Sequence, residues 1–207
     1  LQLTDGCNGD WPFCLFGVKR GVIGKFSYES IEKFMKTYWE AMDIKPSLYW
    51  DSDPFDWHDR GKDFSDIYNL ARKLGDGALY VSTAVPKGTE SSISKFIEMV
   101  AQEFKGFKRD HSLSIYNRYK KFPVKIRFSI ARHNIQRVED ILLNIANEQL
   151  PKLGFDTTDI SDFFNTVVKV NYMIEDAPFK LGALIKTKDP VGEIISPACN
   201  DGVVVSP

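Results

Sequence analysis

Apolar residues along the chain alternate between strand-like and helix-like spacing. Short apolar or alternating runs predict strands at residues 1–4, 47–50, 78–86 and 124–131. Residues 167–174 fit either a further strand or the end of a helix that begins near Asp159, and residues 202–207 predict a last strand. The strands are separated by helix-like segments, so the pattern is one of repeated strand–helix units.

Four segments carry apolar residues at the i, i+3, i+4 spacing of a helix that is buried on one face. Their faces are Ile31, Phe34, Met35, Tyr38 and Met42; Phe64, Ile67, Ala71 and Leu74; Ile93, Phe96, Ile97, Val100 and Phe104; and Val138, Ile141, Leu142 and Ile145. Ser27 and Thr89 are placed to cap the first and third helices, and Gly75 is placed to end the second. Four consecutive strand–helix units predict an α/β fold with parallel strands and right-handed crossovers.

Composition narrows the class of protein. The 207 residues suit a single domain, and 43% hydrophobic with 27% charged residues is typical of a globular protein. A formal net charge of −1 indicates no nucleic-acid partner, and no apolar run is long enough for a membrane span. Three cysteines are an odd number and too few for a disulfide scaffold, so we expect a reducing, cytoplasmic location.

Polar residues gather where the predicted strands end, which is where parallel α/β folds place their chemistry. After the first strand come Thr4, Asp5, Cys7, Asn8, Trp11 and Cys14, and after the second come Asp51, Ser52, Asp53, Pro54, Asp56 and His58. The third strand ends at Ser82 and Thr83, and the fourth is followed by Ser129, Arg132, His133 and Asn134. These residues are expected to meet at one edge of the sheet.

The loop after the first strand has most of a known cysteine motif. Cys7 and Cys14 flank a segment that contains Asn8, Pro12 and Phe13, and it matches C-N-x-x-C-P-F-C except that Trp11 stands in place of the middle cysteine. Over most of its length the chain resembles the radical S-adenosylmethionine (radical SAM) superfamily. The resemblance implies a partial (β/α)6 TIM-like barrel, with mostly parallel strands and outer helices, as one core domain over residues 1–207.

The resemblance also implies two cofactors. One is a 4Fe-4S cluster with Cys7 and Cys14 among its ligands, and the other is S-adenosylmethionine, which chelates the fourth iron. The segment DSDP takes the place of the family's Gly-Gly-Glu-Pro-like segment and keeps its proline. The residues that the resemblance assigns to S-adenosylmethionine are Asp51, Ser52, Asp53, Pro54, Thr83, Ser129 and Arg132.

Trp11 conflicts with this cofactor set. Thiolates hold iron–sulfur clusters, whereas an indole offers an N–H donor and no lone pair for a metal, and it fills the space that a cluster needs. Cys199 is the remaining thiol of the chain, and a partly buried free thiol is its default interpretation, with a substitute ligand as the alternative.

Three functions therefore stay open. An active radical SAM protein would use an electron donor to form a 5′-deoxyadenosyl radical, which takes a hydrogen from a small-molecule or peptide substrate; Trp11 would impair this activity. A non-catalytic binding module on the same fold is the second hypothesis. The third is a divalent-metal hydrolase built on the Asp51–His58 loop, whose Asp and His residues are possible ligands.

One further residue and one further segment each have an ordinary and a functional interpretation. His133 follows a strand and is either a solvated loop residue or an acid–base group. Residues 108–122 mix basic and aromatic side chains, which could contact a nucleic acid or an acidic peptide; a solvated connector is their default interpretation.

Overall fold

The computed structural model describes residues 2–9, 20–38, 52–75, 79–108, 122–173, 185–188 and 194–195. The strands expected at residues 47–50 and 202–207 lie outside these ranges, as do Asp51, Trp11, Cys14 and Cys199. Among the described residues, no helix is long and apolar enough to cross a membrane.

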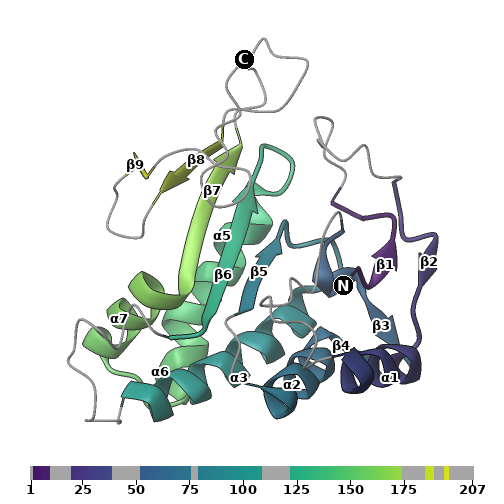
Figure 1. The fold of residues 1–207 in the computed structure, drawn as a ribbon. Coiled ribbons are helices and arrows are strands. Elements are labelled where there is room, and N and C mark those ends of the chain that lie inside the picture. Colours follow the sequence, from purple (N-terminus) through teal and green to yellow (C-terminus); the bar gives the residue numbers. More distant parts are fainter. Residues whose placement is uncertain are drawn as a thin grey trace.

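A five-stranded mixed sheet forms the centre of the structure (Figure 1). Its strands, in spatial order, are β5 (Leu79–Thr83), β6 (Val124–Ile130), β7 (Val168–Met173), β8 (Ile185–Lys188) and β9 (Ile194–Ile195). The pairs β5–β6 and β6–β7 are parallel, whereas β7–β8 and β8–β9 are antiparallel. The α/β class is therefore confirmed, with three parallel strands and two antiparallel strands that the sequence pattern did not predict.

The amino-terminal strands belong to small separate ladders. β1 (Thr4–Asp5) pairs antiparallel with β2 (Gly24–Lys25), and β3 (His58–Asp59) pairs antiparallel with β4 (Lys62–Asp63). The strand predicted at residues 1–4 is thus shorter and shifted. In the described residues its ladder partner is β2 rather than the five-stranded sheet, and the backbone N–H groups of Gly21 and Ile23 extend the pairing to the carbonyls of Cys7 and Asp5.

Helices follow the strands as the pattern predicts. They are α1 (Tyr28–Tyr38), the 3-10 turn η1 (Pro54–Asp56), α2 (Phe64–Leu74), α3 (Glu90–Lys108), α5 (Ile135–Asn144), the π-helical turn η2 (Ile145–Gln149), α6 (Leu150–Lys152) and α7 (Thr157–Val167). α7 ends where β7 begins, so residues 167–174 hold both a helix end and a strand. This settles the alternative that the sequence left open.

Local side chains explain where the helices begin and end. The Ser27 hydroxyl accepts a hydrogen bond from the backbone N–H of Ser30 at 3.2 Å, as predicted for a cap. Asp63 caps α2 in a reciprocal capping box with Asp66, and Gly75 ends that helix. The Thr89 hydroxyl instead donates to the Pro86 carbonyl, so it closes the turn that precedes α3.

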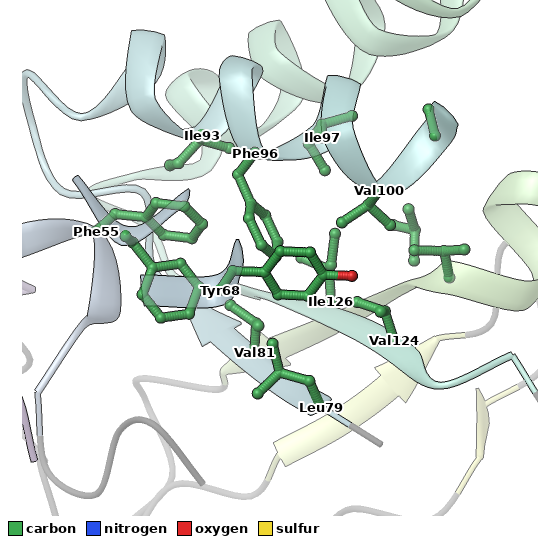
Figure 2. Close-up of a cluster of buried hydrophobic side chains, with 14 of the residues drawn as sticks. Phe55, Tyr68, Leu79, Val81, Ile93, Phe96, Ile97, Val100, Val124 and Ile126 are labelled. Atoms are coloured by element: carbon green, nitrogen blue, oxygen red, sulfur yellow. The ribbon is translucent and has the colours of Figure 1, made fainter. Parts of the chain in front are cut away.

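The core lies between one face of the sheet and the helices. Strands β5 and β6 alternate buried and partly exposed residues, and their buried side chains face α2 and α3 (Figure 2). Phe96 is at the centre of this layer, with rings of Phe55, Phe64 and Tyr68 at centroid distances of 5.5, 5.3 and 5.1 Å. Because Phe55 comes from η1, this aromatic cluster also fixes the loop that carries Asp53 and Asp56.

Candidate functional site

Asp53 joins the loop before η1 to the carboxyl end of β5. Its carboxylate accepts the Thr83 hydroxyl at 2.9 and 3.1 Å and the backbone N–H of Ala84 at 2.7 Å. It also accepts the backbone N–H of Phe55 at 3.1 Å, which starts the turn η1. The side chain is only 5% exposed. Asp53 and Thr83, both expected at the site, are therefore in direct contact.

The electrostatics of Asp53 are unusual for a carboxyl group. Burial, together with the negative charge of Asp56, raises its pKa from 3.8 to about 7, although the bonds from Ala84, Thr83 and Phe55 act in the opposite direction. A carboxyl group that is buried, bonded on both oxygens and placed beside a second carboxylate has a perturbed pKa of the kind common at functional sites.

Asp56 holds the start of the cysteine loop. The backbone N–H of Asn8 donates to one of its oxygens at 2.8 Å, and the Asn8 side-chain amide donates to the other at 2.9 Å. Gly6, two residues earlier, has a φ of +86°, and a Cβ there would lie 1.9 Å from the Gly21 carbonyl oxygen, so glycine is required where the chain passes close to Gly21. Cys7, next to Asn8, is thereby fixed beside the η1 loop.

Cys7 lies in surroundings that disfavour its thiolate. Burial raises its pKa to about 12, and the nearby carboxylates of Asp53 and Asp56 act in the same direction. Its sulfur accepts the backbone N–H of Gly9 at 3.2 Å, which only partly compensates.

Asn134 connects the carboxyl ends of β5 and β6. Its side-chain amide donates to the carbonyls of Ala84 at 2.7 Å and Ser129 at 2.9 Å, and its oxygen accepts the N–H of Ala131 at 2.7 Å. His133, the preceding residue, has its Nε2 atom 3.1 Å from the carbonyl oxygen of Gly9. The described start of the cysteine loop (residues 7–9), the η1 loop and the ends of two parallel strands thus form one hydrogen-bonded unit.

Val85, directly after β5, adopts a backbone conformation that is rare for its type. Its φ is +53°, although the residue is β-branched and fully buried. Its N–H bonds to the Thr83 hydroxyl at 2.9 Å and its carbonyl accepts Nε of Arg137 at 2.7 Å. Such strain costs on the order of 1–3 kcal/mol and concentrates at functional sites.

Ser52 contributes a polar atom that has no partner. The residue is 8% exposed, and its hydroxyl makes no hydrogen bond. A buried hydroxyl without a partner costs roughly 1–3 kcal/mol, so a ligand that bonds to it would recover this energy. Ser52 is one of the residues that the sequence resemblance assigns to a cofactor.

The described residues do not fit a complete iron–sulfur cluster. They contain no group of three or more His, Cys, Asp or Glu side chains that could hold a metal ion. Cys7 stands among carboxylates that oppose its ionisation, whereas cluster ligands are thiolates. With an indole at position 11, the motif also lacks its third sulfur donor.

The metal-hydrolase alternative lacks support in the described part of the loop. The carboxylates of Asp53 and Asp56 accept hydrogen bonds from Thr83, Ala84 and Asn8, so their oxygens already have partners. The His58 side chain is placed by a 3.3 Å contact between its Nδ1 and the Asp56 carbonyl.

The sequence pattern placed many of these residues together at strand ends but did not predict the hydrogen bonds between them. It placed Ser52, Asp53, Pro54, Thr83, Ser129 and Arg132 at strand ends, and the structure links Asp53 to Thr83 directly and Ser129 to Ala84 through Asn134. It gave no connecting role to Asn8 or Asn134. Asn134 directly precedes a helix, which was the available signal for a side chain that bonds to the backbone.

Comparisons of the chain with protein-family models, with curated proteins and with solved structures gave no match.

Proposed function

We propose that the chain is a radical SAM-type core domain that binds an adenosyl compound, S-adenosylmethionine or a close analogue, without a complete iron–sulfur cluster. In this form it is a binding module rather than a radical-generating enzyme. The strands β5, β6 and β7 would be part of a partial (β/α)6 barrel, with the ligand at their carboxyl ends.

The observation that carries this proposal is the hydrogen-bonded unit at those strand ends. Parallel α/β folds bind nucleotide-like ligands just beyond the carboxyl ends of their strands. Here the Asp53–Thr83 contact, the Asn134 bonds and the strained Val85 all lie at that place. Since structural loops rarely keep a rare backbone conformation without compensation, a binding role gives these features a common explanation.

The charges of the unit suit the positive groups of S-adenosylmethionine. This molecule carries an ammonium and a sulfonium group, which negative side chains attract. Asp56 supplies negative charge at this unit, and Ser52, which precedes Asp53 in the sequence, has an unpartnered hydroxyl that would accept an N–H from the ligand's amino group. Ser129 and Arg132, after β6, would meet the ribose or the carboxylate.

Calorimetry with S-adenosylmethionine on the purified chain and on two serine variants tests the proposal. Ser52→Ala removes the unpartnered hydroxyl at the site and should weaken binding about tenfold, which corresponds to about 1.4 kcal/mol. Ser65→Ala is the matched control, because its hydroxyl is also buried and unpartnered but lies in the first turn of α2. Binding that both variants weaken equally, or no binding by the unmodified chain, would contradict the proposal.

A further inference from the structure

The second face of the parallel strands is polar and positively charged. Residues that pair directly across neighbouring strands share a face of the sheet. The register pairs Tyr80 with Lys125, Ser82 with Arg127, Arg127 with Lys169, and Ser129 with Asn171. These seven residues alternate with the apolar ones that pack against the helices, so together they form one surface, the polar sheet face.

The polar sheet face combines three cations with hydrogen-bonding side chains. Its members are Tyr80, Ser82, Lys125, Arg127, Ser129, Lys169 and Asn171, none of which is acidic. Arg127 and Lys169 are direct neighbours across the β6–β7 ladder, and like charges in that arrangement repel each other. Neighbouring strands are about 4.8 Å apart, so the side chains of Arg127 and Lys169 can reach one bound group.

The positive charge of the polar sheet face is not neutralised by carboxylates at its two lysines, and it affects the pKa of one of them. In the parts of the chain that the structure describes, neither Lys125 nor Lys169 forms an ion pair with a carboxylate. Burial and the nearby charge of Lys169 lower the pKa of Lys125 to about 8. Lys125 donates to the Thr166 carbonyl, which holds it at the amino end of the face. An anion bound here would relieve the repulsion.

Asn171 supplies a second, independent sign of a ligand. It is only 2% exposed, and its side-chain oxygen has no hydrogen-bond partner. A buried amide oxygen without a donor is rare, and each case calls for an explanation such as a missing ligand. Because Asn171 pairs with Ser129, this acceptor lies at the end of the face that is nearest the candidate site.

We propose that the polar sheet face binds a phosphorylated small molecule, with Arg127 and Lys169 on the phosphate and Asn171 accepting a hydrogen bond from a ligand hydroxyl. A phosphate monoester carries close to two negative charges at neutral pH and suits several cations better than a single carboxylate does. A polyanionic nucleic acid is less suitable, because the cations are confined to three adjacent strands and the chain as a whole has a net charge of −1. This inference does not depend on S-adenosylmethionine binding, although the two ligands would be neighbours at Ser129.

Calorimetry with ribose 5-phosphate as the probe, and with ribose as its uncharged counterpart at equal ionic strength, tests this inference on the full chain. We expect ribose 5-phosphate to bind and ribose not to bind. Lys169→Gln should weaken the binding of ribose 5-phosphate at least tenfold, and Lys169→Arg should restore most of it. Lys87→Gln is the matched control, because it removes the same charge from an exposed turn and should change nothing.

A pair of amide variants tests the hydroxyl contact separately. Asn171→Ala should weaken the binding of ribose 5-phosphate but leave that of inorganic phosphate unchanged. Gln149→Ala is its control, because Gln149 also has a buried oxygen without a partner but lies in the turn η2. Circular dichroism identifies a variant that fails to fold. If Lys169→Gln fails to fold, the binding of ribose 5-phosphate by Lys169→Arg is compared with that of the unmodified chain instead.

Three outcomes would overturn the inference: no binding of ribose 5-phosphate by the folded chain, an equal loss in Lys87→Gln and Lys169→Gln, or tighter binding of a single-stranded oligonucleotide that displaces the sugar phosphate. S-adenosylmethionine is titrated separately. If ribose 5-phosphate does not bind, the proposed function is unaffected, and if S-adenosylmethionine does not bind, the phosphate site is unaffected.

Discussion

The carboxylate of Asp53 accepts the hydroxyl of Thr83 across 30 residues of sequence, and both groups are buried. This contact joins the η1 loop to the end of β5. The Thr83 hydroxyl also accepts the N–H of Val85, so one side chain positions a carboxyl group and the strained residue beside it.

Thr83→Val should destabilise the protein by about 1–3 kcal/mol, because it leaves a buried carboxylate with one donor fewer and a buried N–H without its acceptor. Thr83→Ser keeps the hydroxyl and should lose much less. Thr37→Val is a surface control, since the Thr37 hydroxyl bonds within the exposed part of α1. Urea unfolding of the three variants measures the difference. Equal stabilities for Thr83→Val and Thr83→Ser would show that the hydroxyl has no such role.

Lys125→Met should stabilise the protein at neutral pH, because the folded state holds a lysine whose pKa is lowered to about 8 from 10.5. The unfolded chain binds more protons between these two values, so the stability of the unmodified protein rises as the pH increases from about 8 to 10.5. Below about pH 8 the cost of the buried charge is present in full. The advantage of the variant should therefore shrink over that interval.

Denaturation midpoints at about pH 7 and about pH 10 measure this change. Lys87→Met is the control, because Lys87 is exposed and its removal should have the same small effect at both values. An advantage of Lys125→Met that stays constant with pH would mean that the lost charge is not its cause.

Trp11→Cys should allow the chain to assemble an iron–sulfur cluster that the unmodified chain does not hold. The change supplies the third thiol of the motif and replaces a bulky indole with a much smaller side chain. Anaerobic reconstitution of both forms, followed by analysis of iron and sulfide, measures the difference. About four irons in the unmodified chain would contradict the expectation, and Cys199 would then be the next ligand to test; no gain in the variant would argue against a cluster loop.

Local patterns predicted the elements whose boundaries depend on nearby residues. The spacing around Ile67 and the stop at Gly75 located α2, and the alternation in residues 124–131 located β6. The antiparallel strands β8 and β9 were not predicted, because β8 is defined by its pairing with β7, and β9 by its pairing with β8, rather than by an apolar pattern of their own. The ladder of β1 with β2 was missed for the same reason.

The site was predictable as a group of residues but not as a set of bonds. Strand ends placed Asp53 near Thr83 because parallel strands end at one edge of a sheet. The bonds from Asn8 to Asp56 and from Asn134 to Ala84 join residues 48 and 50 positions apart, so only the tertiary arrangement shows them. The strain at Val85 has no counterpart in the sequence, since valine is an unfavourable residue for that conformation.

Equilibrium dialysis of labelled S-adenosylmethionine against the iron-free, folded chain determines whether the chain binds this ligand without a cluster. We expect about one molecule bound per chain with a dissociation constant of about 1 mM or lower, which corresponds to −4.1 kcal/mol or more favourable. We also expect weaker binding of S-adenosylhomocysteine, which lacks the positive sulfonium that the Asp56 carboxylate would attract. No binding of S-adenosylmethionine by the folded chain at that concentration, or binding that appears only after a cluster is reconstituted, would contradict the proposed function.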